Sequence, residues 1–136
     1  MTIETAERLV KGFENCTLPK EEWTHEAHFV MAFWVCLQWP LPLAVNKIRE
    51  GIKKYNISVG GQNTGSAGYH ETITLLYTYT IARYIVTGGV TSFTQQSVAA
   101  LLAQPFIAKD YPLNFYSKEA LFSKQARLQW VEPAVN

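Results

Sequence analysis

The sequence predicts an all-α fold, a single-domain bundle of about six helices with two buried helices at its centre. Apolar residues recur at spacings of three and four, which is the period of a helix. Pro and Gly residues divide the chain into segments of helical length. Of the 136 residues, 48% are hydrophobic and 17% are charged, so the chain can form one domain, residues 1–136, around one core.

The first two helices are expected at residues 3–14 and 19–39, with a turn between them. Pro19 suits the first turn of the second helix, where its missing N–H has no partner to lose. The Pro-Leu-Pro sequence at 40–42 ends that helix. Winding the second helix at 100° per residue leaves apolar side chains on every side, which is typical of a buried central helix.

Four further helices are expected, one before the polar loop at 58–68 and three after it. Residues 43–55 form an amphipathic surface helix. Residues 69–87 alternate threonine with β-branched and aromatic residues, as a strand does. Strands are usually 3–10 residues long, however, so we interpret this longer segment as the second buried helix. Helices at 93–102 and 117–130 complete the bundle, with an irregular stretch at 105–112 between them.

Composition excludes several classes of partner. The formal net charge is +1 and no basic run is longer than a pair, so we expect no nucleic-acid partner. The apolar run at 29–39 is about half the ~20 residues of a membrane helix, and no membrane partner is expected. The first residues lack the basic and apolar regions of a signal peptide, which predicts a cytoplasmic protein. Cys16 and Cys36 lack C-x-x-C spacing and are expected to be reduced thiols.

All three histidines stand at the starts of the two most apolar runs. His25 and His28 lie in Trp-Thr-His-Glu-Ala-His at 23–28, and residues i and i+3 share one face of a helix. His70 and Glu71 lie in Gly-Tyr-His-Glu-Thr at 68–72. We expect the starts of the two core helices to meet, so that these four side chains converge on one pocket.

Two kinds of chemistry fit such a pocket. Three protein ligands and an open position are typical of catalytic zinc or iron, and His25, His28 and His70, with or without Glu71, would supply them. This metal-dependent version is the one we favour. In a metal-free version, Glu71, His70 and His28 act as catalytic acids and bases. Residues expected to bind the substrate are Trp23, Tyr55, Asn56, Asn63, Tyr69 and Thr72.

A structural interpretation stands beside both. A histidine at the start of a helix can simply hydrogen-bond a neighbouring carbonyl or cap a turn.

Several motifs together resemble a group of small bacterial helical proteins to which no reaction is assigned. The likeness rests on Trp-Thr-His-x-x-His-Phe at 23–29, Tyr-Asn at 55–56 and Gly-Tyr-His-Glu-Thr-Ile-Thr at 68–74. It extends to Pro-Leu-x-x-Tyr-Ser at 112–117 and Trp-Val-Glu-Pro at 130–133, and so covers most of the chain. The resemblance implies that the two histidine signatures belong together. One departure is Phe29, where a leucine is expected.

The leading functional hypothesis is a small-molecule enzyme for a tailoring step, such as an oxidation, hydrolysis, dehydration or cyclisation. The alternative from another class is a non-catalytic module that binds a small ligand. An exposed edge on the last, aromatic helix is a candidate surface for a homodimer.

Overall fold

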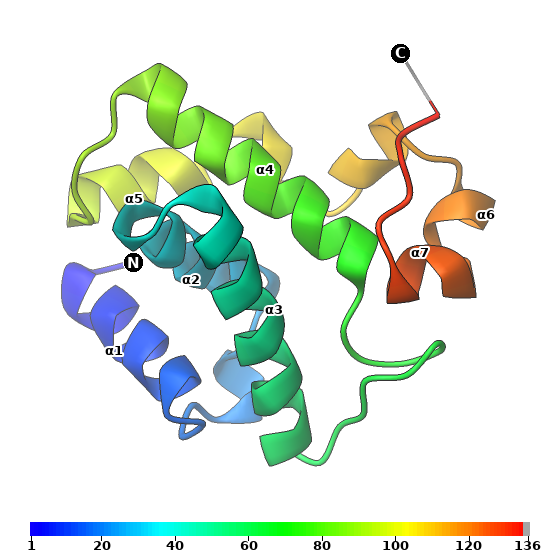
Figure 1. Ribbon diagram of the computed structural model, residues 1–136. Coiled ribbons are helices and arrows are strands. Elements are labelled where there is room, and N and C mark those ends of the chain that lie inside the picture. Colours follow the sequence, from blue (N-terminus) through cyan, green and yellow to red (C-terminus); the bar gives the residue numbers. More distant parts are fainter. Residues whose placement is uncertain (135–136) are drawn as a thin grey trace.

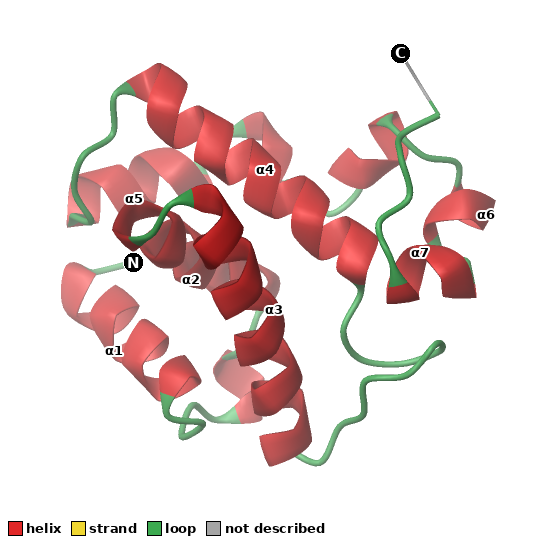
Figure 2. Cartoon of the chain, in the orientation of Figure 1, coloured by secondary structure: helices red, strands yellow, loops and turns green. Residues whose placement is uncertain are grey.

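The computed structural model describes residues 1–134, and these form helices and loops with no strand (Figures 1 and 2). The all-α fold class predicted from the sequence is confirmed. The α-helices are α1 (Ile3–Glu14), α2 (His25–Gln38), α3 (Leu41–Ser58), α4 (Glu71–Gly88), α5 (Gln95–Leu102), α6 (Lys118–Leu121) and α7 (Lys124–Leu128). Three short 3-10 helices are η1 (Lys20–Glu22), η2 (Pro105–Ile107) and η3 (Tyr111–Asn114).

Helix α2 begins later than the sequence predicted. Pro19 precedes only the short η1, and the chain then leaves helical geometry at Trp23. Thr24 adopts an extended conformation, and its hydroxyl accepts a hydrogen bond of 3.2 Å from the Ala27 N–H. A threonine in this position is a strong start signal for a helix. The predicted helix at 19–39 was therefore wrong for its first turn, and His25 and His28 lie in the first turn of α2.

Helix α4 confirms the choice of helix over strand for the alternating segment. Thr78, Thr80 and Thr87 each donate a side-chain hydrogen bond, of 2.7–2.9 Å, to the carbonyl four residues earlier. These bonds satisfy the hydroxyls within the helix, so the alternating pattern does not require a sheet. Gly89 ends α4 in the left-handed conformation at φ +63°.

The last predicted helix is divided into α6 and α7. The hydroxyls of Ser117 and Ser123 each accept a hydrogen bond of 3.1 Å from the backbone N–H three residues on. Ser123 thus caps a second helix and stops the first. The expected continuous helix at 117–130 was wrong for this reason.

Helix α2 lies at the centre of the main core and contacts α1, α3, α4 and α5 (Figure 1). Five consecutive α2 residues, 29–33, are buried, so every side of this helix is covered. A smaller cluster of Leu76, Tyr116 and Leu121 joins α4 to the C-terminal segment. None of the helices within residues 1–134 combines the length and apolar character that a membrane span requires.

Asn63 organises the loop between α3 and α4. Its side-chain oxygen accepts hydrogen bonds from the Asn56 side chain (3.0 Å) and the Tyr69 N–H (3.2 Å), and its nitrogen donates to the Lys53 carbonyl (3.0 Å). The loop therefore turns back on itself. At Gly68, φ is +82° and a Cβ atom would lie 1.6 Å from the Gln62 carbonyl oxygen.

We expect Gly68→Ala to destabilise the protein more than Gly60→Ala. Both glycines have positive φ, so each alanine costs about 1–2 kcal/mol in backbone strain. Only position 68 has a carbonyl in the way, because nothing lies within 4 Å of a Cβ at Gly60. The additional overlap should cost at least about 1 kcal/mol more in the free energy of unfolding. Urea unfolding of the two variants measures the difference, and equal midpoints would contradict it.

Candidate functional site

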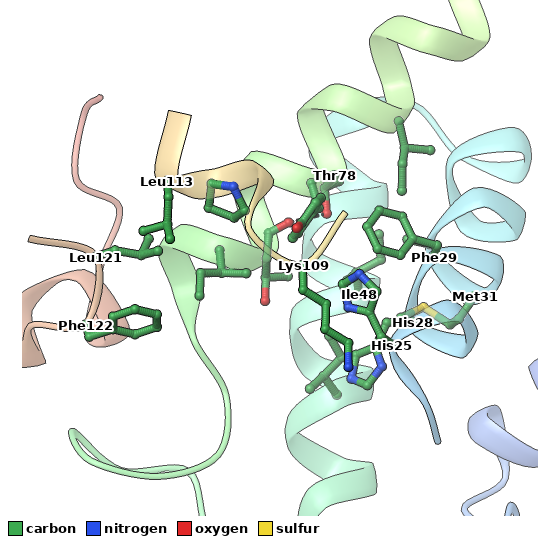
Figure 3. Close-up of a pocket in the computed structure, with 17 residues that line it drawn as sticks. His25, His28, Phe29, Met31, Ile48, Thr78, Lys109, Leu113, Leu121 and Phe122 are labelled. Carbon is green, nitrogen blue, oxygen red and sulfur yellow. Dashed lines mark hydrogen bonds between the residues drawn. The ribbon is translucent and has the colours of Figure 1, made fainter. Parts of the chain in front are cut away.

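A cavity of about 470 Å³ lies between α2, α3, α4 and the chain segment 109–122 (Figure 3). Its wall is mostly aliphatic and aromatic. The polar side chains that line it are His25, His28, Thr74, Tyr77, Thr78 and Lys109. An apolar cavity with a few polar groups is typical of a small-molecule site, which makes this the candidate site of the protein.

The backbone fixes the tautomers of the two cavity histidines when they are neutral. His25 donates from Nε2 to the Ile107 carbonyl and His28 donates from Nδ1 to the Thr24 carbonyl, each at 2.6 Å. A carbonyl oxygen only accepts, so the bonded ring nitrogen must carry the proton. The other nitrogen, Nδ1 of His25 and Nε2 of His28, then has a free lone pair.

Burial favours the neutral form of His28. Burial has the largest effect and lowers the pKa of His28, and the nearby His25 lowers it further, while the hydrogen bond to Thr24 opposes both. The pKa of His28 therefore lies below its ordinary value. The ring also stacks on Trp23, with the ring centroids 3.9 Å apart, so its orientation is held from one side.

His25 shows where α2 meets α4. Its ring packs edge-on against Tyr77, with the centroids 6.1 Å apart, and Tyr77 belongs to the second turn of α4. The start of α2 therefore lies beside the second turn of α4, and His70 and Glu71 at the head of α4 do not line the cavity.

His70 caps α4. Its Nδ1 accepts a hydrogen bond of 3.1 Å from the Ile73 N–H, and its Nε2 donates to the Leu121 carbonyl at 2.7 Å. Both ring nitrogens are thus occupied in the neutral tautomer. The side chain is buried, and burial lowers the pKa of His70. These contacts match the structural interpretation of this histidine.

Glu71 joins α4 to α3. Its carboxylate accepts two hydrogen bonds from Arg49, at 2.9 and 2.7 Å, and a third from the Tyr69 hydroxyl at 2.6 Å. Burial acts to raise the pKa of Glu71, but the hydrogen bonds from Arg49 and Tyr69 outweigh it, and the pKa lies below its usual value. Glu71 is therefore ionised and paired.

The six predicted substrate-binding residues do not line the cavity. Tyr55 donates to the Leu18 carbonyl at 2.8 Å, and Thr72 bonds the Gln129 carbonyl and the Val131 N–H, at 2.9 and 3.2 Å. The ring of Trp23 stacks on the ring of His28. Asn56, Asn63 and Tyr69 hold the loop before α4.

Two residues of the cavity wall, Lys109 and Phe122, had no signal in the sequence. Both are exposed side chains in the irregular C-terminal part of the chain.

The four predicted metal ligands are divided between two places. His25 and His28 line the cavity, whereas His70 and Glu71 make the contacts at the head of α4 described above. Within residues 1–134, no three His, Cys, Asp or Glu side chains are grouped so that they could hold a metal ion. The two free imidazole nitrogens are one fewer than the three ligands of a catalytic zinc site. The iron or zinc centre stays a prediction.

Comparison with known proteins adds no relative: no family model, curated protein or solved structure matches the chain. The resemblance to small bacterial helical proteins stays a prediction. Function must therefore be inferred from the geometry of the cavity.

We expect Glu71→Gln to destabilise the protein at pH 7 by about 1.5 kcal/mol, the lower end for a hydrogen bond to a charged group, because Arg49 is partly exposed. The folded-state pKa of Glu71 lies below the unfolded value of ~4.3. Its contribution is therefore present above pH ~4.3 and is lost as the pH falls through the folded-state pKa. Urea unfolding between pH 7 and pH 3 measures this effect. The difference in the free energy of unfolding between the unaltered protein and Glu71→Gln should become smaller as the pH falls.

Glu50→Gln is the matched control, because Glu50 is an exposed carboxylate one residue from Arg49 in α3. It should change the free energy of unfolding by less than ~0.5 kcal/mol. Equal losses for the two variants would mean that the Arg49–Glu71 pair has no special role.

The imidazoles of His28 and His70 should both titrate below the unperturbed value of ~6.5, because burial disfavours their charged forms. Nuclear magnetic resonance titration of the ring protons, assigned with single His→Asn variants, measures each pKa. A value above ~6.5 for His28 would show that the cavity does not hold its ring neutral.

Proposed function

We propose that this chain is an enzyme that binds a small, largely apolar molecule in the cavity and transforms it by metal-free acid–base chemistry, with His28 as the base. The observation that carries the proposal is the arrangement of His28, a neutral imidazole in an apolar wall with its Nδ1–H bonded to a carbonyl. This arrangement leaves Nε2 as the basic atom.

The surroundings of His28 suit proton transfer. The ring accepts a proton at Nε2, and the positive charge that forms is stabilised at Nδ1–H by the Thr24 carbonyl, 2.6 Å away. Trp23 holds the plane of the ring. A base with a pKa near or below neutrality is unprotonated at pH 7 and ready to react.

His25 is the second acid–base group of the cavity. Its Nε2–H is held by the Ile107 carbonyl, so its free Nδ1 can take up or return a proton. Among the tailoring reactions considered, dehydration and cyclisation need such a proton removed from one atom of the substrate and one returned to another.

The metal-dependent version has weaker support, because His70 and Glu71 bond to Leu121, Arg49 and Tyr69. A non-catalytic binding module would use the same cavity, and its mostly apolar wall favours that second candidate to the same degree. Catalysis of a simple proton transfer separates the two.

The ring-opening of 5-nitrobenzisoxazole tests the proposal, because this small apolar compound reacts with any well-placed base. Nε2 takes the proton from C3, and the C–H electron pair forms the third bond of the nitrile. The N–O bond breaks, and its electron pair stays on oxygen, which leaves as the phenolate. We expect a rate about 100-fold above that of free imidazole at equal concentration. The rate should rise with pH through the low pKa of His28 and be constant above pH 7.

Two variants distinguish the base from the cavity. His28→Asn should lower the rate about 100-fold while leaving binding of the probe intact. Ala32→Phe, on the cavity wall, should remove both binding and rate, and Ala99→Phe, on the exposed side of α5, should change neither. Probe binding with a rate no higher than that of imidazole would leave only the non-catalytic module.

A further inference from the structure

Lys109 is the one side chain with a full, permanent charge among those that line the cavity. No Asp or Glu lines it, so the wall carries a net positive charge. Within residues 1–134 the only ion pair joins Arg49 to Glu71, and no hydrogen bond from the Lys109 side chain is present. No carboxylate of these residues therefore lies within ion-pair distance of the Lys109 ammonium, although the neighbouring Asp110 acts electrostatically on Tyr77 of the same wall.

Lys109 brings the charge to a cavity whose wall is otherwise mostly apolar, with the two histidines, Thr74, Tyr77 and Thr78 as its other polar side chains. Lys109 and Phe122 are exposed and are drawn apart in Figure 3. The lining also includes the buried side chains of Ile48, Ile81 and Thr78. The Lys109 side chain extends toward the two histidines in Figure 3. A ligand thus meets the cation and the imidazoles together, and its remaining atoms meet hydrocarbon.

The volume indicates how large a ligand the cavity can enclose. A cavity of about 470 Å³ holds about 15 water-sized groups at the ~30 Å³ that each occupies in the liquid. A molecule of 10–15 non-hydrogen atoms, by the same ~30 Å³ estimate, would fill most of it.

We propose that the ligand is an amphipathic anion, an apolar chain or ring bearing one carboxylate, which Lys109 binds. An ammonium ion and a carboxylate form a charge-assisted hydrogen bond, the strong kind available to a flexible lysine. The atoms next to the carboxylate then lie at His25 and His28. This inference rests on the proposed function, because it names the ligand of the same cavity.

The test compares decanoate, 1-decanol and decylamine, which share one chain and differ in the charge of the head. Isothermal titration calorimetry of the full chain, below micellar concentrations, measures each affinity. Lys109→Met keeps the length of the side chain and removes its charge. It should weaken decanoate about tenfold and change decanol less than twofold. Lys109→Arg should restore decanoate, and Lys118→Met, an exposed lysine outside the cavity, should have no effect.

The outcomes separate this inference from the proposed function. Equal losses for decanoate and decanol in Lys109→Met, or no loss for either, would overturn the role of the charge. Tighter binding of decylamine than of decanoate to the unaltered protein would also overturn it. If none of the three binds but 5-nitrobenzisoxazole is opened, the ligand class is wrong and the catalytic cavity stands. If neither occurs, both proposals fail.

Discussion

Hydrogen bonds from imidazole rings to backbone carbonyls hold this molecule together at its least regular part. All three histidines make one, to Thr24, Ile107 and Leu121. Two of these carbonyls, of Ile107 and Leu121, belong to the segment after α5, which has only short helical turns, and they accept their hydrogen bonds from the imidazoles. The histidines on α2 and at the head of α4 therefore attach that segment to the core, and the cavity exists between them.

The helical architecture could be predicted because its signals are local. Apolar periodicity, Pro and Gly placed α1 at its observed bounds, and the length of the alternating segment made it a helix rather than a strand. The errors also have a local cause. Thr24 and Ser123 each accept a hydrogen bond from the third residue after it, and such a cap restarts a helix inside an apolar run. Periodicity averages over several turns, so it does not detect a single cap.

The site was harder to predict, because its contacts join distant parts of the chain. The i, i+3 spacing put His25 and His28 on one helical face, and both line the cavity. The same kind of signature at His70 and Glu71 has partners 22 and 51 residues away, Arg49 and Leu121, which no pattern within the motif indicates. The sequence does not distinguish a catalytic histidine or glutamate from one that holds two helices together.

Residues 105–122, which include the cavity-lining segment 109–122, have a consequence for how molecules reach the cavity. This segment is attached by the hydrogen bonds of Tyr77 to the Ala108 carbonyl and of His25 and His70 to Ile107 and Leu121, and by the packing of Tyr116 and Leu121 on Leu76. Segments of this kind open at a lower free energy than the core they cover. Exchange of a guest molecule can then proceed by partial detachment of this segment while the packing of α1, α2 and α3 stays intact. The time that a guest molecule stays bound would then depend on the local stability of this segment rather than on the global stability of the protein.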